Sequence, residues 1–151
     1  MPLLSRSSPL SARRGFSLIE LMIAVAVMVV IVAIAVPTYQ GTVRKSRRTD
    51  ATAAITAAMQ AQERWRTNNP AYSASLADLG QSVNTSNRYY TLSLDGVGAN
   101  GYTVIATAVA GKTQAEDGNC ATLRVRMAAG NITYGSASGW DDQPSRQCWA
   151  R

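Results

Sequence analysis

The chain has 151 residues, 46% of them hydrophobic, and a formal net charge of +6. Its length is that of about one domain, and its hydrophobic content excludes the composition of a disordered chain. It contains no histidine, the commonest general base and metal ligand, and its two cysteines are too few for a cysteine-rich zinc site, so we expect no enzyme, no cofactor and no metal.

The chain begins with a short basic segment followed by a long apolar run. Residues 1–15 carry Arg6, Arg13 and Arg14 and no acidic residue, and residues 16–36 carry a single charge, Glu20. As a helix the run is about 31 Å long, which matches the hydrocarbon core of a bilayer. It is longer than the apolar core of a secretory signal, and no small-residue cleavage site follows it. The pattern predicts a membrane-spanning helix.

Glu20 is the exceptional residue of this run, because a carboxylate near the bilayer centre costs about 2.5–3.5 kcal/mol. One interpretation is a plain signal-anchor helix in which the side chain reaches toward the membrane interface. The other starts from the surrounding string, RRGFSLIELM over residues 13–22. This string resembles the class III signal of type IV pilins and related pseudopilins. The resemblance implies that a prepilin peptidase removes residues 1–15 by cleavage between Gly15 and Phe16, and then methylates the new amino group of Phe16.

In a packed bundle of such helices, the Glu20 carboxylate needs a cation. We expect the new amino terminus of a neighbouring subunit's Phe16 to supply this cation, and the pairing to set the axial register of the subunits, as a buried polar residue does in a coiled coil. The partners expected from the resemblance are therefore other pilin subunits, major and minor, the prepilin peptidase, and the inner membrane before assembly.

Helical spacing continues beyond the apolar run, so residues 37–67 are expected to form the amphipathic half of the same helix. Pro37 lacks an N–H and predicts a kink or local melting where the two halves join. The apolar stripe expected to pack on a domain consists of Ala54, Ile55, Ala58, Met59 and Trp65.

A basic cluster in this half, Arg44, Lys45, Arg47 and Arg48, nearly balances the leader's charges, so the positive-inside rule does not fix the orientation of the helix. We expect the cluster to be a solvated helix face, with anionic lipid headgroups or filament neighbours as alternatives. A lone cysteine pair, Cys120 and Cys148, favours a disulfide in an oxidising compartment. We therefore place the C-terminal domain in the periplasm.

The rest of the chain reads as a loop and a small sheet. Residues 68–88 are polar and turn-rich, with one short helix expected at 75–79. Residues 89–134 contain alternating runs of β-formers, so four antiparallel strands are expected, at 89–94, 102–109, 121–127 and from 132 onward, with a polar loop at 111–119. Residues 135–151 are too rich in Gly, Ser and Asp for long regular structure, and Cys148 would pin this tail to the start of the third strand.

The predicted fold class is α+β, a long N-terminal helix packed on a small antiparallel β-sheet, and it resembles the type IV pilin fold with its αβ-loop and D-region tail. The C-terminal pattern resembles the PilE-like minor pilins. The residues that carry this second resemblance are residues 119–123 (NCATL), Gly130, Ile132, Gly139, Trp140, Cys148 and Trp149. The adjacent acids Asp141 and Asp142 are weak support for a calcium site, since they lack ligand spacing.

The resemblance implies a structural function: a minor pilin that assembles into or primes a pilus used in twitching, adhesion or DNA uptake. Two alternatives stay open, a DNA receptor exposed on the fibre and a type II secretion pseudopilin. For DNA binding, loss of the leader leaves twelve basic and nine acidic residues, a formal charge of +3. The candidate DNA contacts are Arg88, Lys112, Arg124, Arg126, Arg146 and Arg151, with Trp140 and Trp149 near them in sequence.

Overall fold

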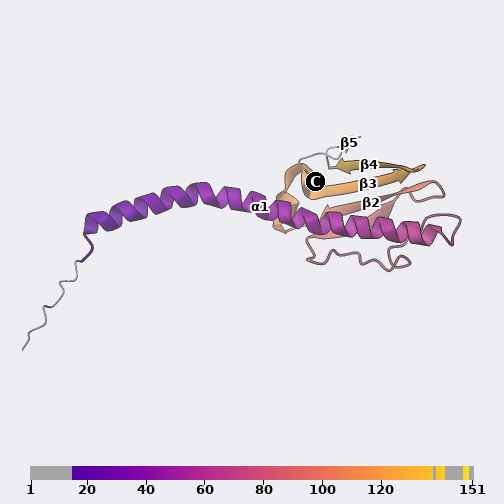
Figure 1. The fold of residues 1–151 in the computed structure, drawn as a ribbon, viewed down its shortest axis with the longest axis horizontal. Coiled ribbons are helices and arrows are strands. Elements are labelled where there is room, and N and C mark those ends of the chain that lie inside the picture. Colours follow the sequence, from indigo (N-terminus) through magenta and orange to yellow (C-terminus); the bar gives the residue numbers. More distant parts are fainter. Residues whose placement is uncertain (1–14, 138, 142–147, 150–151) are drawn as a thin grey trace, which may run out of the picture. The chain divides into compact units, whose positions relative to one another are not determined.

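The structure is a computed structural model that describes residues 15–137, 139–141 and 148–149. The chain divides into two compact units at Thr38 and Tyr39, which we describe separately. The helix α1 spans Leu18–Arg66, so the long helix expected from the sequence is confirmed. The first unit contains its apolar half, and the second unit contains its amphipathic half together with the sheet (Figure 1).

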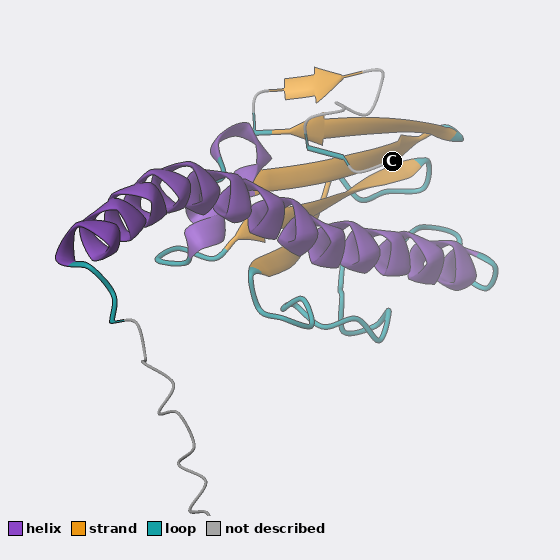
Figure 2. Ribbon diagram, turned by 60° about the vertical axis from the view of Figure 1, so that its left-hand side comes forward, coloured by secondary structure: helices purple, strands orange, loops and turns teal. Residues whose placement is uncertain are grey.

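The sheet of the second unit has five antiparallel strands in sequence order, β1-β2-β3-β4-β5. The strands are β1 Tyr90–Asp95, β2 Gly101–Ala108, β3 Thr122–Ala128, β4 Asn131–Ser136 and β5 Gly139–Asp141. The amphipathic half of α1 lies along one face of this sheet (Figures 1 and 2). The α+β pilin-like fold expected from the sequence is therefore confirmed.

The core lies between α1 and the sheet. From the helix, Ala51, Ile55 and Ala58 are buried, at the four- and three-residue spacing of one helical face. The residues of the sheet that meet them are alternate strand positions, Tyr90, Leu92, Tyr102, Val104, Leu123 and Val125. The expected stripe was right for Ile55 and Ala58, whereas Ala54, Met59 and Trp65 are only partly buried.

A buried polar contact between α1 and the αβ-loop was missed by the sequence analysis. Gln62 has no exposed surface. Its Nε2 donates to the carbonyl oxygen of Ser73 at 2.7 Å, and its Oε1 accepts from the backbone N–H of Ser73 at 2.9 Å. These two hydrogen bonds hold the start of the αβ-loop against α1. They also give both polar atoms of the Gln62 side chain a partner, without which its burial would be costly.

Three local expectations differ from the structure. Residues 76–80 form a hydrogen-bonded turn in place of the short helix, because Gly80 takes a positive φ of 66° and Gln81 N–H donates back to Leu76 O at 2.8 Å. The loop expected at 111–119 contains two 3₁₀ helices, η1 Thr113–Glu116 and η2 Gly118–Ala121. The predicted tail holds the end of β4 and all of β5. Such short elements depend on tertiary contacts more than on local periodicity.

Candidate functional site

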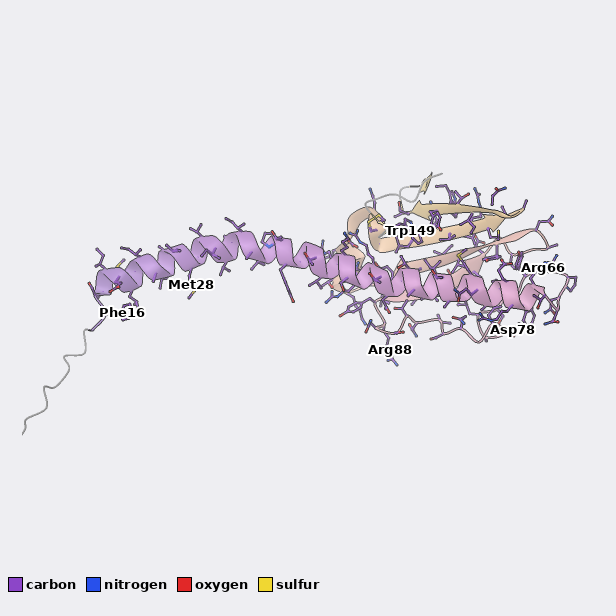
Figure 3. All side chains as sticks on the ribbon, in the orientation of Figure 1. Phe16, Met28, Arg66, Asp78, Arg88 and Trp149 are labelled. Carbon is purple, nitrogen blue, oxygen red and sulfur yellow. A yellow bond between two sulfur atoms is a disulfide. The ribbon has the colours of Figure 1, made fainter. Side chains whose placement is uncertain are left out.

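The first unit presents an uncovered apolar helix. Every described residue up to Thr38 is exposed, including Phe16, which is 81% exposed just before the helix begins. Side chains project from the helix on all sides around Phe16 and Met28 (Figure 3). α1 is long and apolar enough to cross a membrane, and Glu20 lies in its first turn as the acidic residue of that turn. Exposing an apolar surface of this size to water is unfavourable, so we expect lipid or other helices to cover it.

Pro37 lies within α1, and the helical assignment runs through it without interruption, so the structure shows no local melting there. The helix loses one backbone hydrogen bond at this point, since Pro37 has no N–H to donate. At the next residue, Thr38 Oγ1 donates to the carbonyl oxygen of Ile34, one turn earlier in the helix, at 3.2 Å. The kink itself stays a prediction.

The basic cluster that follows is not a fully solvated face, because the loop after β2 folds back onto it. The side chain of Arg48 is 15% exposed and that of Asp117 5% exposed, and they form a bidentate pair. Nε donates to Oδ2 at 2.6 Å and Nη2 donates to Oδ1 at 2.7 Å. These hydrogen bonds raise the pKa of the Arg48 guanidinium, and burial opposes them. Of the four basic residues, only Lys45 is exposed as expected.

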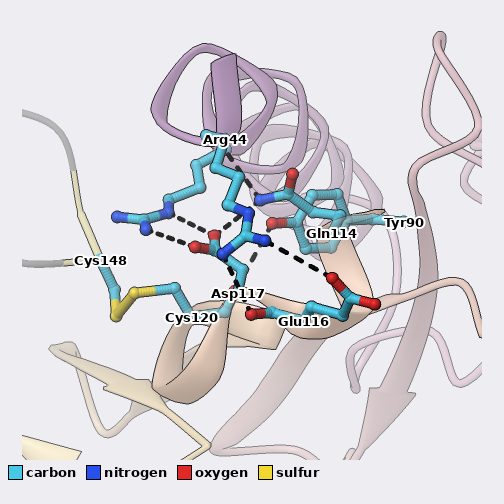
Figure 4. Close-up of polar contacts among 8 residues, drawn as sticks. Arg44, Tyr90, Gln114, Glu116, Asp117, Cys120 and Cys148 are labelled. Carbon is cyan, nitrogen blue, oxygen red and sulfur yellow. Dashed lines mark hydrogen bonds and ion pairs between the residues drawn. A yellow bond between two sulfur atoms is a disulfide. The ribbon is translucent and has the colours of Figure 1, made fainter. Parts of the chain in front are cut away.

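Other polar groups complete this buried network (Figure 4). Gln114 has no exposed surface, and its Nε2 donates to Asp117 Oδ2 at 2.6 Å and to Arg44 O at 3.3 Å. Arg44 forms a second ion pair with Glu116 at 3.5 Å, and this pair is far more exposed. Burial raises the pKa of the neighbouring Tyr90 to about 12. We call Arg48, Asp117 and Gln114 the buried lock, since they fasten α1 to η1 and η2.

Two of the predicted DNA contacts, Arg88 and Lys112, lie near η1 and β1, where a first cation–aromatic cluster surrounds Tyr89. The guanidinium carbon of Arg47 lies 4.2 Å and Lys112 Nζ 5.3 Å from the centre of the Tyr89 ring. Lys112 also donates to Arg88 O at 2.6 Å, and Arg47 donates to the hydroxyl of Thr113. The cations of this cluster are therefore partly engaged within the chain.

A second cation–aromatic cluster brings three other predicted contacts together on the face of the sheet that points away from α1. Arg124 and Arg126 lie on β3 with their guanidinium carbons 4.6 Å and 4.7 Å from the centre of the Trp140 ring. In the strand register Arg124 is opposite Gly135, which is in turn opposite Trp140. A side chain at Gly135 would lie 2.9 Å from the Trp140 ring, so glycine leaves room for this packing.

The disulfide between Cys120 and Cys148 is confirmed, and it ties the tail to the residues just before β3 (Figure 4). Next to it, Trp149 is 7% exposed, donates from Nε1 to Gly135 O at 3.1 Å and meets Tyr134 edge-on at 5.1 Å. Trp149 is thus a core residue and does not reach a DNA ligand from this position. Arg146, Arg151 and Asp142 lie outside the described residues.

Comparison with known proteins connects these features. A family model described as "Prokaryotic N-terminal methylation motif" matches residues 10–36, the segment that holds the apolar run and Glu20. A second model, described as "Type IV minor pilin ComP, DNA uptake sequence receptor", matches residues 37–124, more than half of the chain. The chain belongs to the type IV minor pilin family. The Type IV wide pilus major component PilA4 of Thermus thermophilus is 31% identical to this minor pilin over 96 residues, 62% of this chain and 72% of that protein.

Membership of this family explains why the chain has an apolar helical unit and a second unit that contains the sheet. This minor pilin is a membrane-anchored subunit that assembles into an extracellular type IV pilus, where it interacts with other pilins, and its uncovered apolar helix is the part suited to both surroundings. The family is one of structural subunits. The sequence analysis missed the buried lock and the Gln62 contact of this minor pilin, because no sequence pattern marked Asp117, Gln114 or Ser73.

Proposed function

We propose that the minor pilin enters the fibre through the apolar half of α1 after cleavage between Gly15 and Phe16 and methylation of Phe16. The observation that carries this proposal is an apolar helical surface with every described residue exposed and Glu20 as its one charge. Packing neighbouring helices against this surface buries the carboxylate as well. The amino group that cleavage creates at Phe16 of a neighbouring subunit provides the counter-charge and fixes how far one subunit is shifted along the next.

A set of Glu20 variants tests the proposal. Glu20→Val removes the charge and makes the helix more apolar, so this variant should still insert in the membrane and be cleaved, yet be missing from sheared pili. Glu20→Asp keeps the charge and should retain part of the incorporation. The readout is the amount of this pilin in the fibre fraction divided by the amount in the membrane fraction. Wild-type incorporation of Glu20→Val would remove the role of the carboxylate in assembly.

We also propose that the second unit lies in the periplasm before assembly, with α1 anchored in the inner membrane. The disulfide supports this orientation, because structural disulfides persist in oxidising compartments. In spheroplasts, added protease should degrade the second unit and leave a membrane-protected fragment of α1. Full protection of the second unit until the membrane is lysed would reverse the orientation.

A second candidate function is DNA binding by the pilin on the fibre. Two observations favour it: the family model that matches residues 37–124 is described as that of a DNA uptake sequence receptor, and the second unit carries two cation–aromatic clusters. Such clusters provide the positive charge that phosphate binding requires. The intact mature pilin in detergent micelles should therefore retard a duplex oligonucleotide at low salt and release it as salt rises. Lack of retardation at low salt would end this candidate.

A further inference from the structure

We propose that Arg124, Arg126 and Trp140 form a phosphate clamp, in which the two guanidinium groups bind successive phosphates of a nucleic-acid backbone and Trp140 is the residue that positions them. This inference rests on the second candidate function, DNA binding. The inference adds to that function the surface that binds, the part of the nucleic acid that is contacted and the role of the aromatic ring.

The strand geometry places the two cations side by side. Arg124 and Arg126 are two residues apart on β3, so their side chains leave the same face of the sheet about 6.7 Å apart. This separation is comparable to the spacing of successive phosphates along a strand of nucleic acid. Leu123 and Val125 alternate with them and are buried on the opposite face, which fixes this orientation of β3.

The Trp140 ring holds both guanidinium groups. Each lies within 4.7 Å of the ring centre, in the range of a cation–π contact. The ring reaches this position because its cross-strand neighbour Gly135 has no side chain to obstruct it. Arginine side chains lose much rotamer entropy when they bind a ligand, and two stems that are already packed against a ring lose less. The ring thus preorganises the clamp.

The charges of the clamp are available for a ligand. Within the described part of the chain, Arg124 and Arg126 have no ion-pair partner, whereas Arg44 and Arg48 are paired with Glu116 and Asp117. The residues opposite the two arginines in the neighbouring strands carry no charge: Thr103, Ile105, Thr133 and Gly135. The surface is therefore complementary to a polyanion, and it is less engaged within the chain than the cluster around Tyr89.

The occupied ring also indicates how the clamp binds. Two guanidinium groups pack against Trp140, so the ring is taken up by cations and is not the platform on which an unpaired base would stack. Contacts to phosphate carry no sequence information. We therefore expect the clamp to bind duplexes of different sequence with equal strength, and to provide affinity while other contacts provide any preference for a sequence.

The test measures binding of a fluorescent duplex oligonucleotide to the mature full-length pilin in detergent micelles, over a series of salt concentrations. Each phosphate contact contributes about 0.9 to the slope of log affinity against log salt, so Arg124→Gln with Arg126→Gln should lower the slope by about 1.8. The matched control, Lys45→Gln with Arg64→Gln, removes the same charge at two exposed positions outside both cation–aromatic clusters and should leave the slope near the wild-type value. Thermal unfolding of each variant checks that the second unit remains folded.

Trp140 is tested with two substitutions. Trp140→Ala releases two arginine side chains that must then be ordered on binding and should weaken binding roughly fivefold to 150-fold, whereas Trp140→Phe keeps an aromatic ring and should restore most of the affinity. Bound DNA should also change the tryptophan fluorescence of the wild-type pilin, and the change should be absent from Trp140→Phe, a signature that a merely structural role would not give.

The outcomes of these experiments distinguish an error in the clamp from an error in the DNA-binding function. If the wild-type pilin binds DNA and the arginine double variant keeps the full salt slope, the clamp is wrong while DNA binding stands. If Trp140→Ala binds as tightly as wild type, the positioning role is wrong. If the wild-type pilin does not bind the duplex at low salt, DNA binding and the clamp are overturned together.

Discussion

Replacing Asp117 with asparagine should strongly destabilise the second unit. Asp117 and Asn have nearly the same shape, so the change removes the negative charge and leaves the Arg48 guanidinium in place with its side chain only 15% exposed. The substitution also alters the acceptor of two short hydrogen bonds, from Arg48 Nε and from Gln114 Nε2, both at 2.6 Å. An uncompensated buried charge is the main consequence.

Breaking a buried ion pair by removing one partner costs about 3–5 kcal/mol. Because Arg48 keeps slight access to water, we expect about 3 kcal/mol for Asp117→Asn. For a domain of this size such a loss lowers the midpoint of thermal unfolding by roughly 10–15 °C. The neighbouring Glu116→Gln is the matched control. Its ion pair with Arg44 is 3.5 Å long with Glu116 77% exposed, so its loss should change the free energy of unfolding by less than about 1 kcal/mol.

Tryptophan fluorescence of the mature pilin in detergent, followed during heating and in urea, measures both variants. Trp149 reports on the second unit because it is buried beside the disulfide. A third variant, Arg48→Met with Asp117→Leu, removes the unpaired charge and should recover part of the stability, because Gln114 Nε2 still loses its acceptor on Asp117. Equal and small losses for Asp117→Asn and Glu116→Gln would refute the claim that the buried lock fastens the loop to α1.

Three further predictions concern the second unit. Gln62→Leu should lower the free energy of unfolding by about 2–4 kcal/mol, because both backbone groups of Ser73 lose their partner, and hydrogen exchange should rise in the αβ-loop. Burial raises the pKa of Tyr90 to about 12, so stability that is complete below pH 10 should fall as the pH rises toward 12. Absorbance at 295 nm should show one phenol of the folded unit that ionises only near pH 12. Replacing Cys120 and Cys148 with serine opens a loop with a sequence separation of 28 and should cost about 3.6 kcal/mol in urea unfolding; a loss under 1 kcal/mol would contradict the chain-entropy account.

Periodicity was enough to predict the long helix and the first four strands, because burial in those elements follows a simple repeat. Ala51, Ile55 and Ala58 recur at helical spacing, and Leu123 and Val125 alternate with two arginines. The same alternation predicted that Arg124 and Arg126 face away from the core. Periodicity did not identify Gln62 as buried, because its amide is satisfied by a loop whose path only the tertiary structure fixes.

The buried lock could not be predicted from the sequence. Arg48 belongs to a basic cluster that indicates a solvated face, and its partner Asp117 is 69 residues away in a loop without a motif. The association of Trp140 with the two arginines was equally hidden. It depends on β5, a strand of three residues, whose register alone brings the ring beside Gly135. Sequence reasoning named the residues of this cluster without placing them together.

Mass spectrometry of this pilin recovered from sheared pili tests the central claim most directly. The account predicts that the chain is present in the fibre fraction and that its first residue is Phe16 with a methylated amino group. Absence of the chain from the fibres, or a chain there that still begins at Met1, would contradict the claim that cleavage after Gly15 prepares the apolar helix for assembly.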